Sequence, residues 1–288
     1  MQKGSTKIDI KLEKQLIEKK LKELRANNSD KETITSMMKS FGLVRANIHG
    51  WPNTYVFTKA MGEILLMKTK DTLPLIIIRP TMVTSTHSEP FPGWIEGIRT
   101  IDFVVVNYGN GTLSNFVGNQ DTILDVIPVD MVVNFMIVAS MALSKGLSQK
   151  LVYHIGSSLR NPFKCLDLIN VMYYYFKKYP CINQYGKPIV VTEKLNLFSA
   201  RVNELNQNKG LKLGMKTEDF YRAYSFFKGI FDVKNVEMLR MATKEFIDID
   251  DGFNFDPRSL NWKDYMMNDH FPGLMKHSVK ALPIRSKM

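Results

Sequence analysis

Apolar residues recur at helical spacing near the start of the chain, among many Lys and Glu side chains. This pattern predicts an amphipathic helix from Leu12 to Leu24 that packs one stripe on a core. The polar stretch 27–30 ends it, and Asp30 or Thr33 can open a second helix that runs through Met38. The residues that form the apolar stripe are Leu12, Leu16, Ile17, Leu21 and Leu24.

A further helix is predicted after Pro52 and through Leu66. Asn53 or Thr54 is suited to cap it, and Pro52 suits the entry. Beyond the cap the chain continues in residue types that favour helices, namely Ala60, Met61, Ile64, Leu65 and Leu66.

Three later apolar runs predict strands. The run 73–80 is uninterrupted and bounded by prolines, which is typical of a strand covered on both faces in a parallel sheet. Residues 125–130 predict a short strand that leads into a helix over 131–143, and residues 151–156 predict the next strand. Helices that alternate with such strands favour an α/β fold. Ligands of these folds bind beyond the carboxyl ends of strands, so residues 79–82 are expected near a site.

The texture of the chain changes beyond Pro180. Asn161 and Pro162 form a cap and first-turn pair that predicts a helix through Tyr179. Later segments, such as 220–227, have patterns that predict helices and are rich in aromatic residues. This change predicts a domain boundary near Pro180, which divides the chain into domains 1–180 and 181–288. The acidic run 248–252 is interpreted as a capped turn, because its glycine and its twelfth position do not fit a calcium loop.

Two stretches are interpreted as a loop and a turn. Residues 89–94 combine turn formers with aromatic residues and predict a structured loop. It is either a lid on the substrate side or a rigid connector with a buried Trp94, and the connector is slightly favoured. The run 103–106 followed by Gly109 and Gly111 is similar to the start of a dinucleotide fingerprint. Ser114 stands where the third glycine belongs, so this stretch is interpreted as a turn.

Composition and charge are those of a globular protein with an excess of cations. The 288 residues are 44% hydrophobic and 23% charged, with a net charge of +11. An anionic partner such as a phosphate-bearing small molecule or a membrane surface fits this charge, and a solubilising surface fits it best. No nucleic-acid partner is expected, because the lysines are interleaved with acids and no nucleic-acid-binding signature is present.

Cysteines and apolar runs narrow the class of protein further. Cys165 and Cys181 are the only cysteines, which suggests a reducing compartment without a disulfide framework, and no spacing to the histidines predicts a metal site. His154, in an apolar strand, is interpreted as a core histidine. The first 22 residues are too charged for a signal peptide. The apolar run 126–143 contains Asp130 and is broken by Pro128, so no transmembrane segment is predicted.

Candidate chemistry lies in the helix predicted after Pro52. Tyr55 and Lys59 are four residues apart, which places their side chains on one helix face, one turn apart. A positive charge beside a phenol favours loss of its proton, so the pair suits a proton donor. Because Tyr and Lys are common surface residues, the spacing alone is more typical of a solvated helix face, and the neighbouring motifs decide.

Taken together, these motifs resemble those of a plant fatty acyl-CoA reductase of the male-sterility type. The resemblance covers essentially the whole chain, including a C-terminal part similar to the family's smaller sterile-type domain. It is carried by residues 50–63, 78–81, 89–97, 125–130, 231–232 and 261–273. The resemblance implies a Rossmann-like domain of the extended short-chain dehydrogenase type, followed by a smaller, mostly helical domain.

The resemblance also implies a reaction. The family reduces long-chain acyl-CoA to a primary alcohol through an aldehyde and consumes two NADPH. Tyr55 would donate the proton to the carbonyl oxygen, and Lys59 would hold the nicotinamide ribose and make Tyr55 a better donor. Pro80, Thr81 and Met82 would line the nicotinamide pocket. An intracellular location follows, with the cytosolic face of the endoplasmic reticulum or the plastid as options, and peripheral membrane association is compatible with the charge.

One departure from the family pattern keeps alternatives open. Family members begin with a strand, a Gly-rich turn and further strands, one of which carries a Ser or Thr partner for the tyrosine. The residues before Tyr55 hold no Gly-rich loop after a strand, so we expect only part of the nucleotide-binding domain here. The first alternative is an inactive, truncated remnant that binds acyl chains or partners a complete reductase. The second is a protein that uses its basic charge on anionic lipid.

Overall fold

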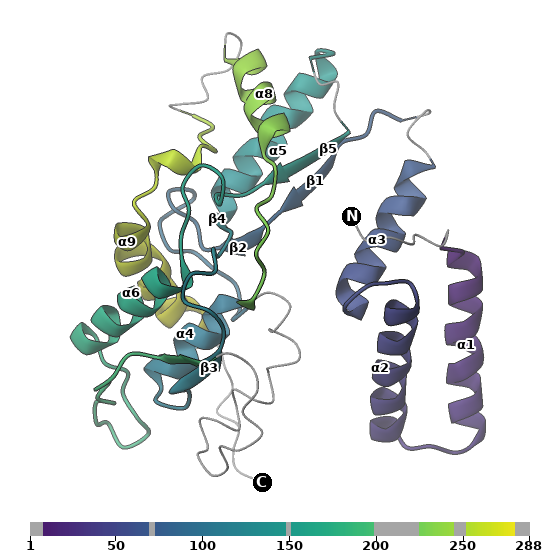
Figure 1. The fold of residues 1–288 in the computed structure, drawn as a ribbon, viewed down its shortest axis with the longest axis horizontal. Helices are drawn as coiled ribbons and strands as arrows, with labels where there is room; N and C mark the ends of the chain where they lie inside the picture. The colour runs from purple at the N-terminus through teal and green to yellow at the C-terminus, as the bar shows by residue number, and fades with distance from the viewer. Residues whose placement is uncertain (1–7, 69–72, 148–150, 199–224, 245–251, 280–288) are drawn as a thin grey trace. The chain divides into compact units, whose positions relative to one another are not determined.

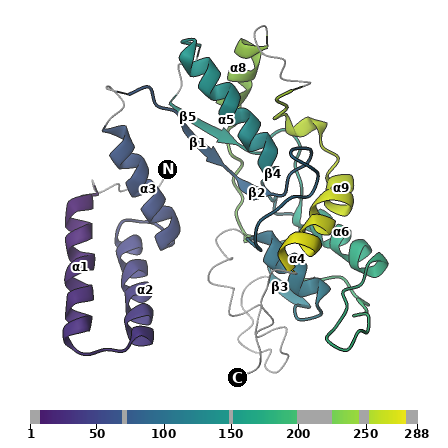
Figure 2. The same ribbon diagram turned by 180° about the vertical axis from the view of Figure 1, so that it is seen from behind.

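The computed structural model describes residues 8–68, 73–147, 151–198, 225–244 and 252–279 (Figures 1 and 2). The chain divides into two compact units, Met1–Leu75 and Ile76–Met288, which we call the N-terminal unit and the C-terminal unit. The domain boundary at 180/181 stays a prediction. The segments predicted as an aromatic-rich helix (220–227) and as an acidic turn (248–252) lie largely outside the described residues.

The described part of the N-terminal unit contains three helices, α1 (Ile10–Ala26), α2 (Lys31–Ile48) and α3 (Thr54–Met67). Each begins at a side chain that accepts from the first turn: Asp9 from Lys11 N, Asp30 from Thr33 N, and Asn53 from Val56 N. The first and third helices are confirmed. The second runs ten residues beyond the predicted Met38, because Gly42 does not interrupt it but packs closely on Thr54.

A buried ionic cluster joins the first two helices. Glu13 on α1 is 2% exposed and pairs with Arg45 of α2 through Arg45 Nη2 and through Arg45 Nε at 2.9 Å. His49 Nε2 lies 2.9 Å from the same carboxylate, and the His49 ring stacks on Phe57 of α3 at 5.2 Å. One carboxylate therefore positions the end of α2 against both of its neighbours.

Parallel strand pairs form the centre of the C-terminal unit. Strand β1 (Ile77–Pro80) pairs with β5 (Val152–Ile155), β2 (Met82–Thr84) with β4 (Val126–Pro128), and β3 (Asn115–Val117) with β6 (Asn196–Phe198). Figure 1 shows β1 and β5 side by side. The strands predicted at 73–80, 125–130 and 151–156 are confirmed, although each is shorter than its apolar run.

Helices cover these strands. Helix α5 (Val129–Ser144) packs on β4 and β2, and α8 (Lys234–Thr243) packs on β5 and α5 (Figure 2). Helices α4 (Ile101–Gly109) and α6 (Cys165–Lys178) contact each other, and α6 contacts the C-terminal run. That run comprises η1 (Pro257–Ser259), α9 (Trp262–Tyr265), η2 (Met266–His270), α10 (Phe271–Gly273) and η3 (Leu274–Val279).

A single aromatic-rich core connects the C-terminal run to α6. The Tyr175 and Phe271 rings lie 5.3 Å apart, and those of Phe163 and Trp262 lie 5.4 Å apart. The Trp262 indole N–H donates to Asn161 O at 2.9 Å, so even its polar edge is satisfied inside this contact. Among the described residues, no helix is both long and apolar enough to cross a membrane.

Three local predictions were wrong. The turn predicted over 103–111 is mostly helix α4, and Gly111 with a φ of 66° lies just after its end. Helix α6 begins at Cys165 rather than after Asn161, because the Asn161 amide donates to Pro257 O and Leu260 O instead of capping. Trp94, expected to be buried, is 36% exposed.

Candidate functional site

The first group of predicted site residues lies at the start of α3. Tyr55 is in its first turn and is 63% exposed, and Lys59 follows one turn later and is also exposed. The Asn53 cap fixes where the helix begins, and therefore the face on which the pair lies. Both polar ends are available to a ligand that approaches this face.

The second group lies where β1 becomes β2. Pro80 is the last residue of β1, Met82 is the first of β2, and Thr81 lies between them. Thr81 N donates to Ile155 O at 2.9 Å, and Met82 N donates to Asp125 O at 2.9 Å. The backbone thus changes partner from β5 to β4 at Thr81, at the carboxyl end of β1, where ligands of parallel sheets bind.

A buried carboxylate supports this change of partner. Asp125, which is 8% exposed, accepts from Ser157 N at 2.7 Å, from Ser158 N at 3.3 Å and from the Ser158 hydroxyl. These donors offset the cost of burying its charge. The backbone after β5 is therefore held beside Thr81. Sequence reasoning noted Asp125 only as the start of a strand, and the Gly-Ser-Ser that follows β5 was the missed signal.

Two hydroxyl groups at this edge are buried without a partner. Among the described residues, neither Thr81 Oγ1 nor Ser157 Oγ forms a hydrogen bond. Gly156 lies between their backbones, and a Cβ atom there would come 2.6 Å from Thr81 Cγ2. An unpaired buried hydroxyl is costly unless something binds it. Thr81 and Ser157 therefore suit the polar groups of a bound cofactor.

A polar network lies behind the end of β2. His270 Nε2 lies 3.0 Å from Asp102 Oδ1, and His270 Nδ1 lies 3.0 Å from the Ser85 hydroxyl. The Tyr265 hydroxyl donates to Thr84 Oγ1 at 2.8 Å, and burial raises the pKa of this phenol. All five side chains are buried. The network joins the C-terminal run to the sheet edge.

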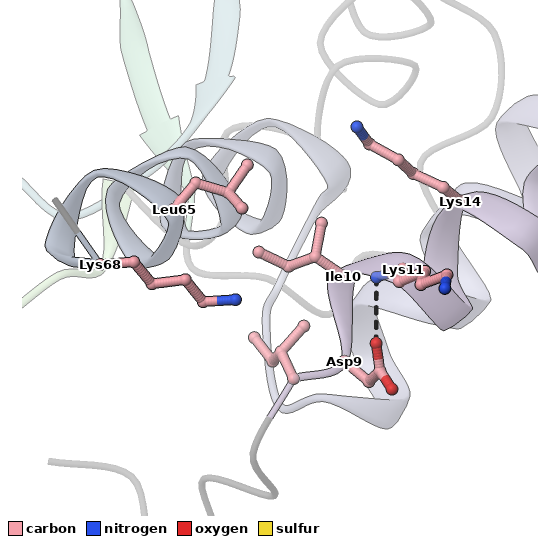
Figure 3. A pocket seen from close by; sticks show the side chains of 7 residues that line it. Asp9, Ile10, Lys11, Lys14, Leu65 and Lys68 are labelled. Carbon is pink, nitrogen blue, oxygen red and sulfur yellow. Dashed lines mark hydrogen bonds between the residues drawn. The ribbon is translucent and has the colours of Figure 1, made fainter.

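A hollow of about 640 Å³ lies elsewhere in the N-terminal unit (Figure 3). It lies between the start of α1 and the end of α3, where Leu65 and Lys68 face Asp9 and Ile10. On α3, Leu65 lies six residues after Lys59 and Lys68 lies thirteen after Tyr55, so the hollow is about 9–20 Å along the helix from the candidate pair. We therefore do not assign it to the same site.

The other reactive side chains offer no second centre. Burial raises the pKa of the Cys165 thiol to about 11, which makes it a poor nucleophile. His154 is half-buried, and its Nε2 lies 3.3 Å from Arg79 Nη1. Within the described part of the chain, no group of three or more His, Cys, Asp or Glu side chains is placed to hold a metal ion.

The structure brings together the residues within each group. Tyr55 and Lys59 share a helix face in the N-terminal unit, whereas Pro80, Thr81 and Met82 share one strand edge in the C-terminal unit. The two groups lie in different units of the chain, so a joint action of both is a proposal.

Comparison with known proteins connects both groups to one family. Two domain models described as "Male sterility protein" match the chain, an NAD-binding domain over residues 5–136 and a Sterile domain over residues 188–281. A relative from Arabidopsis thaliana with a fatty acyl-CoA reductase name is 41% identical over 291 residues, which cover 92% of this chain and 71% of that relative. The chain belongs to the fatty acyl-CoA reductase family.

Two further members of the family match with higher identity. "Fatty acyl-CoA reductase 1" of Arabidopsis thaliana is 44% identical over 307 residues, which cover 96% of this chain and 62% of that protein. "Alcohol-forming fatty acyl-CoA reductase" of Simmondsia chinensis is 44% identical over 305 residues, with 95% and 62% covered. The chain thus spans about three fifths of the length of these relatives, and its fold is an α/β fold with part of a Rossmann-like NAD-binding domain.

Proposed function

We propose that this chain catalyses the NADPH-dependent reduction of long-chain acyl-CoA to a primary fatty alcohol through an aldehyde. The observation that carries the proposal is the exposed pair Tyr55 and Lys59, on one face of a capped helix, in a chain of the fatty acyl-CoA reductase family. The named activity of the relatives supports the substrate class.

In each reduction Tyr55 supplies a proton. Bound at this site, NADPH would supply the hydride for the carbonyl carbon, first of the thioester and then of the aldehyde. Tyr55 donates its phenol proton to the carbonyl oxygen as negative charge develops there. Lys59, one turn away, stabilises the phenolate that remains until solvent returns the proton. The first reduction gives a hemithioacetal; its C–S bond then breaks, its hydroxyl proton passes to the sulfur, and the CoA thiol leaves the aldehyde behind. The second reduction leaves the alcohol.

The residues at the end of β1 are assigned to the cofactor. Pro80, Thr81 and Met82 provide backbone and side-chain surface for the nicotinamide end. The Thr81 and Ser157 hydroxyls, which have no hydrogen-bond partner in the described part of the chain, provide hydrogen-bonding groups for its polar atoms. The Asp125 carboxylate keeps Ser157 in place by accepting from its amide. These residues fit the cofactor because the two hydroxyl groups have hydrogen-bonding capacity that the described residues do not use.

The excess of cations and the substrate class support a location beside membranes. Acyl-CoA carries phosphate groups and a chain that partitions into lipid, and a net charge of +11 favours anionic surfaces. We therefore propose an intracellular protein with peripheral membrane association, on the cytosolic face of the endoplasmic reticulum or in the plastid.

The proposal is tested by measuring fatty alcohol from octadecanoyl-CoA and NADPH with the purified chain. We expect Tyr55→Phe to lower the rate at least about 100-fold, because it removes the transferred proton. Tyr185→Phe is the matched control, since Tyr185 is a 76% exposed tyrosine outside the site, and should keep the full rate.

Unchanged alcohol formation in Tyr55→Phe contradicts the assigned role. A fluorescence titration with NADPH separates loss of chemistry from loss of cofactor, because Tyr55→Phe should bind NADPH as the parent chain does. If the parent chain neither binds NADPH nor forms alcohol, the proposed activity is wrong. The chain is then an inactive member of the family, and its function is to bind acyl chains or to act as partner of a complete reductase.

A further inference from the structure

The loop that follows β2 is closed on itself by a threonine. We call residues 86–94 the aromatic loop. Thr86 N donates to Trp94 O at 3.0 Å, and Gly93 N donates to Thr86 O at 2.9 Å. The Thr86 hydroxyl donates to Phe91 O at 2.6 Å and accepts from Trp94 N at 2.8 Å. These bonds fix both ends of the loop in one geometry.

A second group holds the first half of the aromatic loop. Asp130, in the first turn of α5, accepts from three successive backbone amides: His87 N at 3.0 Å, Ser88 N at 2.7 Å and Glu89 N at 3.1 Å. Asp130 is 7% exposed, so these charge-assisted bonds form largely away from water and are strong. The loop is thereby anchored to the helix that covers the sheet.

The second half of the loop packs backbone against backbone on the C-terminal run. Gly93 has a φ of 79°, and a Cβ there would come 2.4 Å from Asp269 O. A Cβ on Gly273 would come 1.8 Å from Gly93 O. Only glycines permit this approach, and a loop held so closely on three sides is rigid. It is therefore a fixed platform rather than a lid that opens and closes.

This rigid loop presents aromatic side chains to solvent. Phe91 is 46% exposed and Trp94 is 36% exposed, and the prolines beside Phe91 are exposed as well. The Phe91 ring has one contact with the His277 ring at 5.9 Å. Large apolar side chains held rigidly in water mark a binding surface more often than a core.

The charges around the aromatic loop select the kind of ligand. Residues 86–98 contain Glu89 and Glu96, both exposed, and no Lys or Arg. The two carboxylates disfavour an anionic group directly beside them, whereas cations stand outside this segment: Arg99 follows it, and Lys276 precedes the His277 that contacts Phe91. A neutral alkyl chain makes apolar contacts at no electrostatic cost. The loop also follows directly after the carboxyl end of β2, the edge at which ligands of parallel sheets bind.

We infer that Phe91 and Trp94 form the platform on which the acyl chain of the substrate lies, and that they determine the preference for long chains. This inference rests on the proposed function, because it takes the substrate class from there. Both rings contact the alkyl chain and neither takes part in the proton transfer. The CoA headgroup lies elsewhere, away from Glu89 and Glu96.

The test is a binding experiment that needs no turnover. The 288-residue chain is titrated with octadecanoyl-CoA below its micelle concentration, and with acetyl-CoA, which has the same headgroup. Trp94 is itself the reporter, because an exposed indole emits at shorter wavelength once an alkyl chain covers it. We expect a saturable blue shift with octadecanoyl-CoA only, and its loss in Trp94→Phe, which should still bind in a calorimetric titration.

Alanine variants then measure the contribution of each ring. Phe91→Ala and Trp94→Ala should each weaken octadecanoyl-CoA binding about tenfold, by calorimetry, and leave acetyl-CoA binding unchanged. Phe91→Leu should recover most of the affinity. Tyr185→Ala, which removes an exposed aromatic ring elsewhere, should bind both ligands as the parent chain does.

Three outcomes overturn the inference. The first is the absence of a saturable signal from the parent chain with octadecanoyl-CoA. The second is equal affinity of Phe91→Ala and the parent chain for octadecanoyl-CoA. The third is an equal loss of affinity for octadecanoyl-CoA and for acetyl-CoA in the alanine variants. Failure of the proposed function has a different signature. In that case the chain-length-dependent binding persists and depends on both rings, while no alcohol forms.

Discussion

At the scale of single residues, Gly156 illustrates how tightly the candidate cofactor edge is built. A Cβ at this position would lie 2.5 Å from Asp125 Oδ1 and 2.6 Å from Thr81 Cγ2. Neither neighbour can move freely, because the Asp125 carboxylate is bonded to two backbone amides and Thr81 continues a strand pair. We therefore expect Gly156→Ala to lower the free energy of unfolding by about 1–3 kcal/mol in urea denaturation.

A double variant tests whether the clash is the cause. Thr81→Ala removes two of the three crowded side-chain atoms, Cγ2 and Oγ1, so it should return part of the stability that Gly156→Ala loses. Strictly additive losses in the double variant would show that the crowding lies elsewhere. NADPH binding by the same variants should weaken together with their stability, because Gly156 and Thr81 both line the assigned cofactor edge.

The sequence named some of these residues and not others. Pro80, Thr81 and Met82 were expected near a site because they follow a continuous apolar run, and the structure places them at the end of β1. Their role toward a cofactor stays a prediction. Gly156 and the Asp125 carboxylate were missed as neighbours of Thr81. More than forty residues of chain separate each of them from Thr81, and no local pattern encodes which strand lies beside another.

At the scale of elements, Glu13 is the residue on which the packing of α1 against α2 depends. The hydrogen bond from Arg45 lowers the pKa of this carboxyl below its usual 4.5, against the opposing effect of burial. We expect Glu13→Gln to destabilise the N-terminal unit by about 2 kcal/mol at pH 7, because it leaves the Arg45 guanidinium without its charged partner. Glu23→Gln is the control: its exposed pair with Lys20 should contribute under about 1 kcal/mol.

The same shift gives this difference a pH dependence. A carboxyl whose pKa is lower in the folded state stabilises the fold above its unfolded pKa, and that stabilisation is lost as the pH falls through the folded value. The gap in stability between the parent chain and Glu13→Gln, followed by circular dichroism, should therefore be full at pH 6–7 and close below about pH 4. A gap that stays constant down to pH 3 would falsify this assignment.

Elements with their own start signals were the ones that the sequence predicted well. Helices α1 and α3 carry Asp or Asn caps before a periodic apolar stripe, and both begin within two residues of the predicted position. Helix α4 was missed because Gly109 and Gly111 resemble turn chemistry, while its all-apolar run fits a strand as well as a buried helix. The start of α6 was wrong because Asn161 bonds to residues almost a hundred positions away.

At the scale of the whole molecule, no sequence pattern links the two groups of candidate site residues. Tyr55 and Lys59 lie in one compact unit and the strand edge lies in the other. The family relationship connects the two groups, whereas spacing along the chain does not. For the aromatic loop the sequence slightly favoured a rigid connector, but the contacts that hold it come from Asp130 and Gly273, in distant parts of the sequence, and were not predicted.

The buried phenols of the C-terminal unit make its stability sensitive to alkali. Burial raises the pKa of Tyr108 and Tyr175 to about 12, and it also raises that of Tyr265. The folded state therefore holds these phenols in their protonated form, and the Tyr108 hydroxyl donates a hydrogen bond to Glu193 O at 2.8 Å. Because an unfolded tyrosine ionises near pH 10, the folded state loses stability as the pH rises from about 10 toward 12.

Absorbance at 295 nm, which follows tyrosine ionisation, checks this expectation. Of the 11 tyrosines, exposed ones such as Tyr185 should ionise near pH 10, whereas Tyr108, Tyr175 and Tyr265 should ionise only as circular dichroism reports unfolding. Tyr175→Phe removes one late proton, so its urea midpoint relative to the parent chain should be higher at pH 11 than at pH 7. Ionisation of all 11 near pH 10 in a chain that stays folded would mean that solvent reaches these phenols, and with them the core that joins α6 to the C-terminal run.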